Sequence, residues 1–176
     1  MKFFRIAPAL LALLPLLAVP ASGQALKGHN AKAPVDVDAD RIEVLDRSDR
    51  AIFSGNVRVR QAGLTLSAGR LTVAYDNAGG GVDIERLDAS GGVTVTSASE
   101  TATGDFAVYD LPRRLITMVG GVTLTQGANR ISGGRLVIDL DTGRSVIDGS
   151  SVGAPGVDGG SSGRVTGRFT VTDRSK

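Results

Sequence analysis

The chain is built on a repeated pattern in which apolar and polar residues alternate. The step Gly-(Gly/Asn)-Val-x-(Val/Leu) occurs three times, at residues 55–59, 91–95 and 120–124. A period of two places apolar side chains on one face of an extended strand and polar side chains on the other. The repetition predicts an all-β protein with almost no helix.

A second alternating stretch begins with a charged residue and recurs with the first. It starts at Arg41, Arg70, Asp105 and Arg135, at intervals of 29, 35 and 30 residues. Each unit is expected to contain an alternating strand, an acidic turn, a returning strand, the Gly step and a third strand. Short connections at 77–81, 111–114 and 141–143 are typical of antiparallel hairpins. Three units and part of a fourth cover residues 39–149.

The N-terminus has the layout of a secretory signal peptide. Lys2 and Arg5 precede an apolar run over residues 6–19, which is shorter than the roughly 20 residues of a membrane span. Cleavage is expected after Ala21 or Ala25, and an uncleaved anchor is the alternative. The remaining chain is expected to divide into a flexible leader (26–34), a β domain (35–147), a Gly/Ser-rich loop (148–163), a final edge strand (164–172) and a tail (173–176).

The residue inventory argues against an enzyme. There is no cysteine, and the only histidine, His29, lies in the expected flexible leader, where it is interpreted as a solvated residue. A catalytic triad or a thiolate metal site therefore lacks its residues. Without Lys2 and Arg5 the 20 basic residues fall to 18, equal to the 18 acidic residues, so no electrostatic footprint for nucleic acid is expected.

Two groups of carboxylates are candidates for catalytic pairs or calcium ligands. These are Asp36, Asp38 and Asp40 in one stretch and Asp139 with Asp141 in another. Both are expected to be solvated strand faces or turns. The basic pairs Arg58 with Arg60 and Arg113 with Arg114 are expected on solvated faces or beside an anionic head group. No metal or other cofactor is predicted.

Three stretches resemble the OstA-type domain of the periplasmic lipopolysaccharide-transport family that includes LptA, LptC and LptD. They are VDVDADR at 35–41, FSGNVRVRQ at 53–61 and LTLSAGRL at 64–71. The resemblance implies an open, twisted antiparallel β-jellyroll in the periplasm that holds the acyl chains of lipopolysaccharide between two sheets. It also implies end-to-end stacking between the membranes, as a head-to-tail homo-oligomer with LptC-like and LptD-like partners. The Gly/Ser-rich segment before the final strand departs from the family pattern.

The resemblance assigns lipid binding to the apolar residues expected on the inner face. They are Val35, Val37, Val57, Val59, Leu64, Leu66, Leu71, Val73, Ile84, Val93, Val95, Phe106, Val108, Ile116, Val122, Leu124, Leu136 and Ile138. The edges for end-to-end pairing are expected at Val35, Val37, Val165, Phe169 and Val171.

Because a filled core and a lipid groove use the same residue types, the residues alone leave several functions open. Alternatives are a membrane-anchored LptC-like partner, a structural β-repeat protein without ligand and a carbohydrate-active enzyme. Each buried acyl methylene is worth about 0.8 kcal/mol, so a lipid crossing an aqueous compartment needs a continuous apolar lining.

Overall fold

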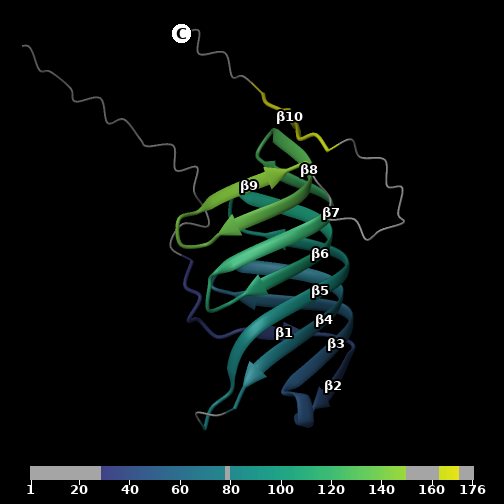
Figure 1. Ribbon diagram of the computed structural model, residues 1–176, viewed down its shortest axis with the longest axis vertical. Helices are drawn as coiled ribbons and strands as arrows, with labels where there is room; N and C mark the ends of the chain where they lie inside the picture. Colours follow the sequence, from purple (N-terminus) through teal and green to yellow (C-terminus); the bar gives the residue numbers. More distant parts are fainter. Residues whose placement is uncertain (1–28, 78–79, 150–162, 171–176) are drawn as a thin grey trace, which may run out of the picture.

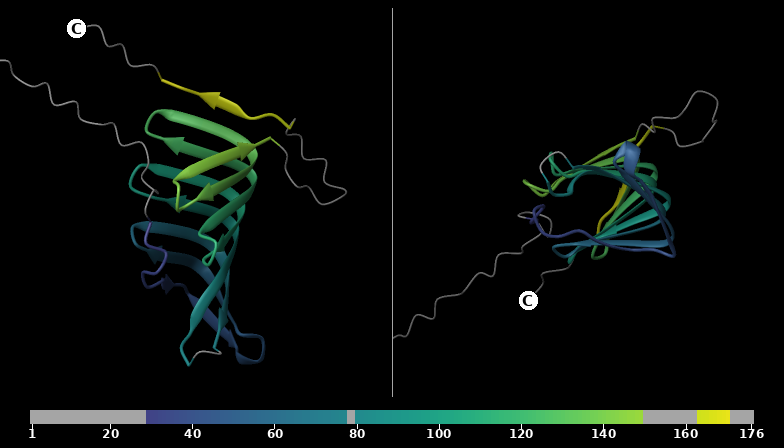
Figure 2. Two further views of the ribbon diagram at one scale, coloured as in Figure 1. Left: turned by 60° about the vertical axis from the view of Figure 1, so that its left-hand side comes forward. Right: turned by 90° about the horizontal axis from the view of Figure 1, so that it is seen from below.

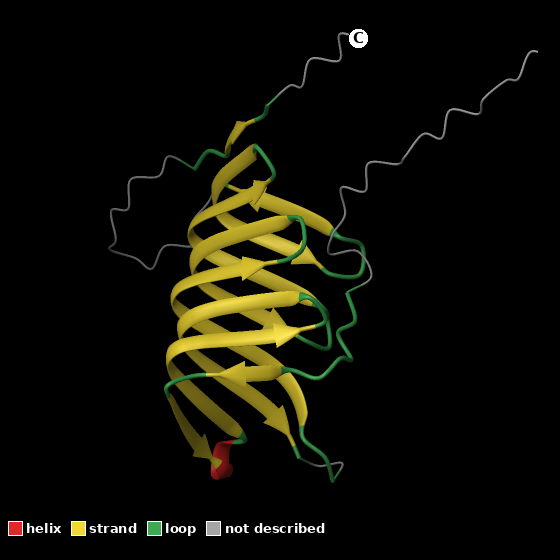
Figure 3. Ribbon diagram, turned by 180° about the vertical axis from the view of Figure 1, so that it is seen from behind, coloured by secondary structure: helices red, strands yellow, loops and turns green. Residues whose placement is uncertain are grey.

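Ten antiparallel strands form one continuous sheet in the computed structural model, which describes residues 29–77, 80–149 and 163–170 (Figure 1). The strands are β1 (Asp36–Asp38), β2 (Arg41–Leu45), β3 (Arg50–Gln61), β4 (Leu64–Asp76), β5 (Asp83–Thr96), β6 (Glu100–Asp110), β7 (Leu115–Gln126), β8 (Asn129–Asp139), β9 (Arg144–Asp148) and β10 (Thr166–Arg168). The only helical element in the described residues is a single 3-10 turn, Asp46–Ser48 (Figure 3). The predicted all-β class is confirmed.

The strand order runs β1-β3-β4-β5-β6-β7-β8-β10, with β2 also paired to β3 and β9 also paired to β8. From β2 to β9 each strand pairs with the next one in the sequence, as the short predicted hairpins require, whereas β1 pairs with β3 and β10 with β8. The final strand predicted over 164–172 is present as β10, at the end of the sheet next to β8. The predicted signal peptide and most of the Gly/Ser-rich segment lie outside the described residues.

The sequence pattern predicted that the Gly step separates two strands. In the structure it is instead a β-bulge within one long strand. In β3 the pairing jumps from Ser54 opposite Arg70 to Val57 opposite Ala68, so Gly55 and Asn56 share one partner residue. Gly55 and Asn56 have φ values of 79° and 46°. Gly91 and Gly92 in β5, and Gly120 and Gly121 in β7, repeat this arrangement. A bulge of two residues against one bends the strand and increases its twist.

The row of bulges divides the sheet into two leaves. Leaf 1 contains β2, β9 and residues 50–54, 70–76, 83–90, 106–110, 115–119 and 135–139. Leaf 2 contains β1, β10 and residues 57–61, 64–68, 93–96, 100–104, 122–126 and 129–133. Viewed along the long axis, the leaves join on one side and diverge on the other (Figure 2). This is the open antiparallel β-jellyroll that the family resemblance implied.

The structure contradicts the prediction that Phe106 and Val108 point inward. Their exposed fractions are 55% and 37%, whereas Ala107 and Tyr109 are buried. The single residue opposite the bulge of β5 is Asp105, which together with Phe106 points away from the interior. The alternation in β6 is therefore shifted by one residue relative to the repeat as aligned at the charged residues Arg70, Asp105 and Arg135.

The prediction of a flexible leader with a solvated histidine is also wrong for the part that the structure describes. Residues 29–35, which we call the strap, lie at the open side between the two leaves (Figure 2). His29 contacts Gln61 through its ring Nε2, and Val35 packs against the core. The strap then continues into β1.

Candidate functional site: the apolar interior and its side opening

The two leaves enclose an apolar interior that contains most of the predicted lipid-binding residues. The buried ones are Val57, Val59, Leu64, Leu66, Leu71, Val73, Val93, Val95, Ile116, Val122, Leu124, Leu136 and Ile138. Val35, Val37 and Ile84 are partly buried and pack against this core. Only Phe106 and Val108 lie on the outer face.

Further buried residues were missed by the sequence reasoning. They are Ala51, Ala68, Leu87, Ala89, Ala102, Ala107, Tyr109, Leu111, Met118 and Leu140. A signal for some of them was present, because the inner face continues across each bulge at a spacing of four. Ala89 precedes Val93 in this way, and Met118 precedes Val122.

The interior is closed along its middle. Leu71, Ile116 and Leu136 have no exposed surface at all. One cavity between the leaves, beside Val59, Leu87 and Tyr109, and another, beside Val95 and Leu124, each measure about 10 Å³. Such a volume holds at most one water molecule. An acyl chain therefore fits between the leaves only if they separate.

The interior is open at the end formed by β2. Ile42 pairs with Phe53 and Val44 pairs with Ala51, so both β2 residues lie on the inner face of leaf 1. Each is nevertheless 55% exposed, because no part of leaf 2 covers them. At the other end, Val165 and Phe169 beside β10 are also exposed, whereas the predicted edge residue Val171 lies outside the described residues. Each end thus presents unpaired strand edges beside apolar side chains.

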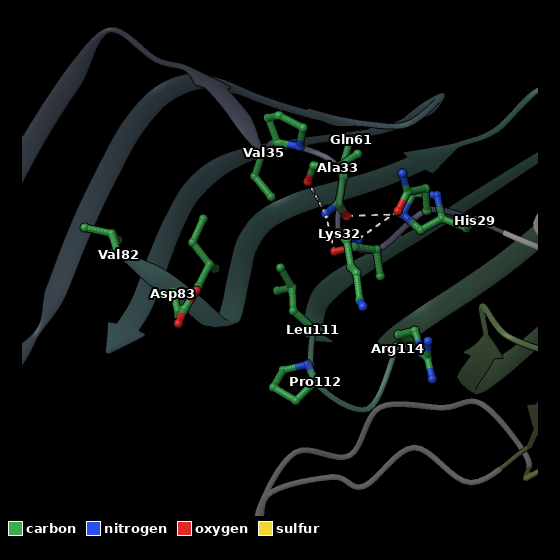
Figure 4. A pocket seen from close by; sticks show the side chains of 14 residues that line it. His29, Lys32, Ala33, Val35, Gln61, Val82, Asp83, Leu111, Pro112 and Arg114 are labelled. Atoms are coloured by element: carbon green, nitrogen blue, oxygen red, sulfur yellow. Dashed lines mark hydrogen bonds between the residues drawn. The ribbon is translucent and has the colours of Figure 1, made fainter. Parts of the chain in front are cut away.

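A pocket of about 860 Å³ lies at the side opening between the leaves (Figure 4). Its lining comes from the strap, from Val82 just before β5 and Ile84 within it, and from the β6–β7 turn at Leu111 and Pro112. The cationic side chains of Lys32 and Arg114 also line it. The carboxylate of Asp83 lines it as well, so the pocket combines apolar walls with charges of both signs, directly outside the apolar interior.

Gln61 closes the floor of this pocket. It is 3% exposed and is the only buried polar side chain in the described part of the chain. Its Oε1 accepts hydrogen bonds from the Tyr109 hydroxyl at 2.9 Å and from Nε2 of His29 at 3.1 Å, with His29 as the Nε2–H tautomer. Its Nε2 donates to the carbonyl oxygens of Ala31 and Ala33, both at 3.0 Å. All four hydrogen-bonding positions of the amide are used.

Gln61 thereby joins three parts of the molecule that are distant in sequence. It ends β3 in leaf 2, Tyr109 belongs to leaf 1, and the other partners belong to the strap. Burial raises the pKa of the Tyr109 hydroxyl to about 12, and the nearby Arg114 guanidinium partly opposes that shift. The hydroxyl is therefore a neutral donor at physiological pH. Sequence reasoning missed Gln61, because a polar residue at the end of an alternating strand carries no distinguishing signal.

The candidate catalytic pair Asp139 and Asp141 makes structural contacts instead. Oδ1 of Asp139 accepts the backbone N–H groups of Asp141 and Thr142, and these hydrogen bonds, with that of Thr142 foremost, lower the pKa of Asp139. Asp141 pairs with Arg114 at 2.8 Å.

The carboxylates near the N-terminal end are partnered in the same manner. Asp38 pairs with Arg60 at 2.6 Å, and Asp40 accepts a hydrogen bond from Asn56 beside the first bulge. Within the described ranges, no cluster of three or more His, Asp or Glu side chains could hold a metal ion. Over the same ranges, no helix is long and apolar enough to cross a membrane.

Comparison with known proteins identifies the family to which the chain belongs and a solved structure with a similar fold. Residues 36–144 match the family described as "LptA/(LptD N-terminal domain) LPS transport protein". An uncharacterized protein of Rhizobium meliloti (strain 1021) is 37% identical over 90 residues, which is 48% of this chain and 48% of that protein. The match thus spans about half the length of this curated relative.

The fold is similar to a solved structure from Pseudomonas aeruginosa. This is LptH, described as the LptA homologous periplasmic component of the conserved lipopolysaccharide transport device. The TM-score is 0.67 at 19% sequence identity, over 80% of this chain and 98% of LptH. At this identity the similarity establishes the fold.

Proposed function

Because the chain belongs to the LptA/LptD N-terminal domain family of lipopolysaccharide transport proteins, we propose that it carries lipopolysaccharide through the periplasm with the acyl chains between its two leaves. The observation that supports this most directly is the continuous apolar interior, which runs from β2 at one end to β9 at the other. A dozen acyl methylenes would gain on the order of 10 kcal/mol from leaving water.

The proposal includes assembly at the ends of the sheet. β1 and β2 lie at one end, and β9 and β10 lie at the other. Unpaired edges invite the addition of another strand. Pairing of unlike ends is heterologous and generates open chains of subunits, either with copies of this protein or with LptC-like and LptD-like partners. Such a chain would place the apolar interiors of successive subunits in line.

Photocrosslinking with two phenylalanine positions tests the lipid-binding proposal. Phe53 lies on the inner face and packs against the core, whereas Phe106 lies on the outer face and is 55% exposed. A photoreactive phenylalanine analogue at position 53 should crosslink to lipopolysaccharide, and the same analogue at position 106 should not. Since both replace a phenylalanine, the perturbation is matched. Equal labelling at the two positions would rule out binding between the leaves.

A further inference from the structure

The strap and Gln61 together occupy the side opening through which an acyl chain could reach the interior. Gln61 and Val35 line both the outer pocket and the small cavity beside Tyr109. These two side chains are therefore the partition between solvent and the apolar interior. Figure 4 shows Gln61 beneath the strap, with dashed lines marking its hydrogen bonds to strap residues.

We propose that residues 29–35 are a releasable closure over a side entrance for acyl chains, and that Gln61 is the clamp that holds it shut. This inference rests on the proposed lipid-binding function. It adds a route by which chains enter sideways, in addition to the open ends of the sheet. Leu111 and Pro112 give the pocket an apolar wall for an acyl chain, and Lys32 lies beside it. The other charged residues of the lining are Asp83 and Arg114, and Arg114 is paired with Asp141.

The clamp is suited to release because its hydrogen bonds to the strap are few and all meet at one side chain. Three hydrogen bonds join the strap to the Gln61 side chain: His29 donates one, and the carbonyl oxygens of Ala31 and Ala33 accept the other two. The backbone hydrogen bonds within the strap are two isolated turns, from the Ala31 N–H to the His29 carbonyl and from the Ala33 N–H to the Asn30 carbonyl. They do not fasten the strap to a strand, and they open once Gln61 no longer holds the strap in place. The fourth bond of Gln61, from Tyr109, ties leaf 2 to leaf 1. Breaking the hydrogen bonds of Gln61 therefore frees the strap and also removes the hydrogen bond that joins the two leaves at the side opening.

The chain offers a matched control for this residue. Gln126 ends β7 as Gln61 ends β3, at the same margin of leaf 2. It donates to Glu100 at 3.0 Å and is not among the hydrogen-bonding partners of the strap. Comparison of Gln61→Leu with Gln126→Leu thus separates loss of the clamp from loss of an amide at the end of a strand. His29→Ala is a second variant, which removes one strap contact and leaves the Gln61–Tyr109 bond in place.

The first measurement is hydrogen–deuterium exchange of the full chain, followed in peptides that cover the strap. Each hydrogen bond contributes on the order of a factor of two to ten in the opening equilibrium. Strap exchange should therefore rise about ten-fold or more in Gln61→Leu, rise less in His29→Ala and stay unchanged in Gln126→Leu. Unchanged strap exchange in a folded Gln61→Leu protein, or in His29→Ala if Gln61→Leu does not fold, would overturn the clamp.

The second measurement is the rate at which the protein takes up 11-(dansylamino)undecanoic acid, a fluorescent fatty acid, in stopped flow. If the strap gates uptake, the wild-type rate should level off at high probe concentration at the rate of strap opening. In Gln61→Leu the plateau should rise about ten-fold, and in Gln126→Leu it should not move. If exchange shows that the strap is released in Gln61→Leu but its uptake plateau equals that of the wild type, the strap does not gate the entry of acyl chains. If no variant binds the probe, the proposed function and the entrance both fail, while the exchange data still decide whether Gln61 holds the strap.

Discussion

A buried polar group in an apolar interior is stable only while every hydrogen-bonding position is satisfied, and Gln61 meets that condition with four partners. Its bond with Tyr109 crosses from one leaf to the other, between side chains that are 3% and 2% exposed. The bulged strands join the leaves along one side, but apolar side chains facing each other across the interior make no directional contact between them. The Gln61–Tyr109 bond supplies one directional contact between them.

The raised pKa of Tyr109 gives this contact a pH signature. The folded-state pKa is about 12 and the unfolded value is 10, so the neutral hydroxyl stabilises the fold fully below pH 10. That contribution, up to about 2 kcal/mol, is lost as the pH rises from 10 to 12. Tyr109→Phe should lower the free energy of unfolding at pH 8 by about 1 kcal/mol through the lost hydrogen bond.

Denaturation in urea at pH 8 and at pH 11.5 measures the effect. The deficit of the Tyr109→Phe variant should shrink or reverse at pH 11.5, because only the wild type then has to keep a buried phenol neutral. A deficit that is the same at both pH values would show that Tyr109 ionises as freely in the folded protein as in the unfolded one.

At the scale of strands, the bulges turn one sheet into two leaves. The Gly120 bulge also fixes how closely β7 approaches β6, since a methyl group added at Gly120 would collide with the Asp105 side chain. Gly120 has a φ of 86°, which side chains disfavour by about 1–2 kcal/mol. Gly63, in the β3–β4 turn, has a φ of 85° and open space around it.

Gly120→Ala and Gly63→Ala therefore form a matched pair. Gly63→Ala should lower the free energy of unfolding by about 1–2 kcal/mol, from the backbone alone. Gly120→Ala should lower it by more, because it adds the collision with Asp105. Relief of that excess when Gly120→Ala is combined with Asp105→Gly, which removes the Cβ as well as the carboxylate, would locate the penalty in urea denaturation, with Asp105→Gly alone as the reference. Equal effects of the two single variants would mean that the bulge yields to the methyl group.

The bulges also mark the limit of what alternation could predict. Period two along the strands, the Gly steps and the short turns were sufficient for the all-β class, the hairpin order and most interior residues. They did not reveal that each Gly step lies within a strand, since a bulge and a turn use the same glycines. The phase of β6 was misread for that reason, because Asp105 stands opposite a bulge where Gly69 stands in β4.

The strap was unpredictable on different grounds. Its alternation, in which Ala31, Ala33 and Val35 are separated by Lys32 and Pro34, depends mainly on small residues. Its order comes from contacts with Gln61, which is about 30 residues away. Local pattern carries no information on such a contact. A single histidine in a polar leader is ordinarily solvated, and only the fold places it against a buried amide.

For the molecule as a whole, the two ends of the sheet differ chemically, and this asymmetry favours chains over closed pairs. The β2 end exposes Ile42 and Val44 on the inner face of leaf 1. The opposite end of the same leaf is β9, whose Ile147 packs against the core. Joining β2 of one copy to β9 of the next would cover the exposed residues and extend the apolar interior. The same operation would bring β1 of one copy to β10 of the next, in leaf 2.

Ile42→Asp tests this association. Because Ile42 is 55% exposed, the change should have little effect on the free energy of unfolding of a single copy. In an end-to-end contact the carboxylate would be buried without a partner, which costs several kcal/mol. Sedimentation velocity over a range of concentrations should show wild-type association and a loss of about 100-fold or more in the variant. Val108→Asp, on the outer face of β6 and 37% exposed, is the control and should associate as the wild type does. A wild type that sediments as a single copy at every concentration would rule out self-association. Two variants that associate equally would place the contact elsewhere.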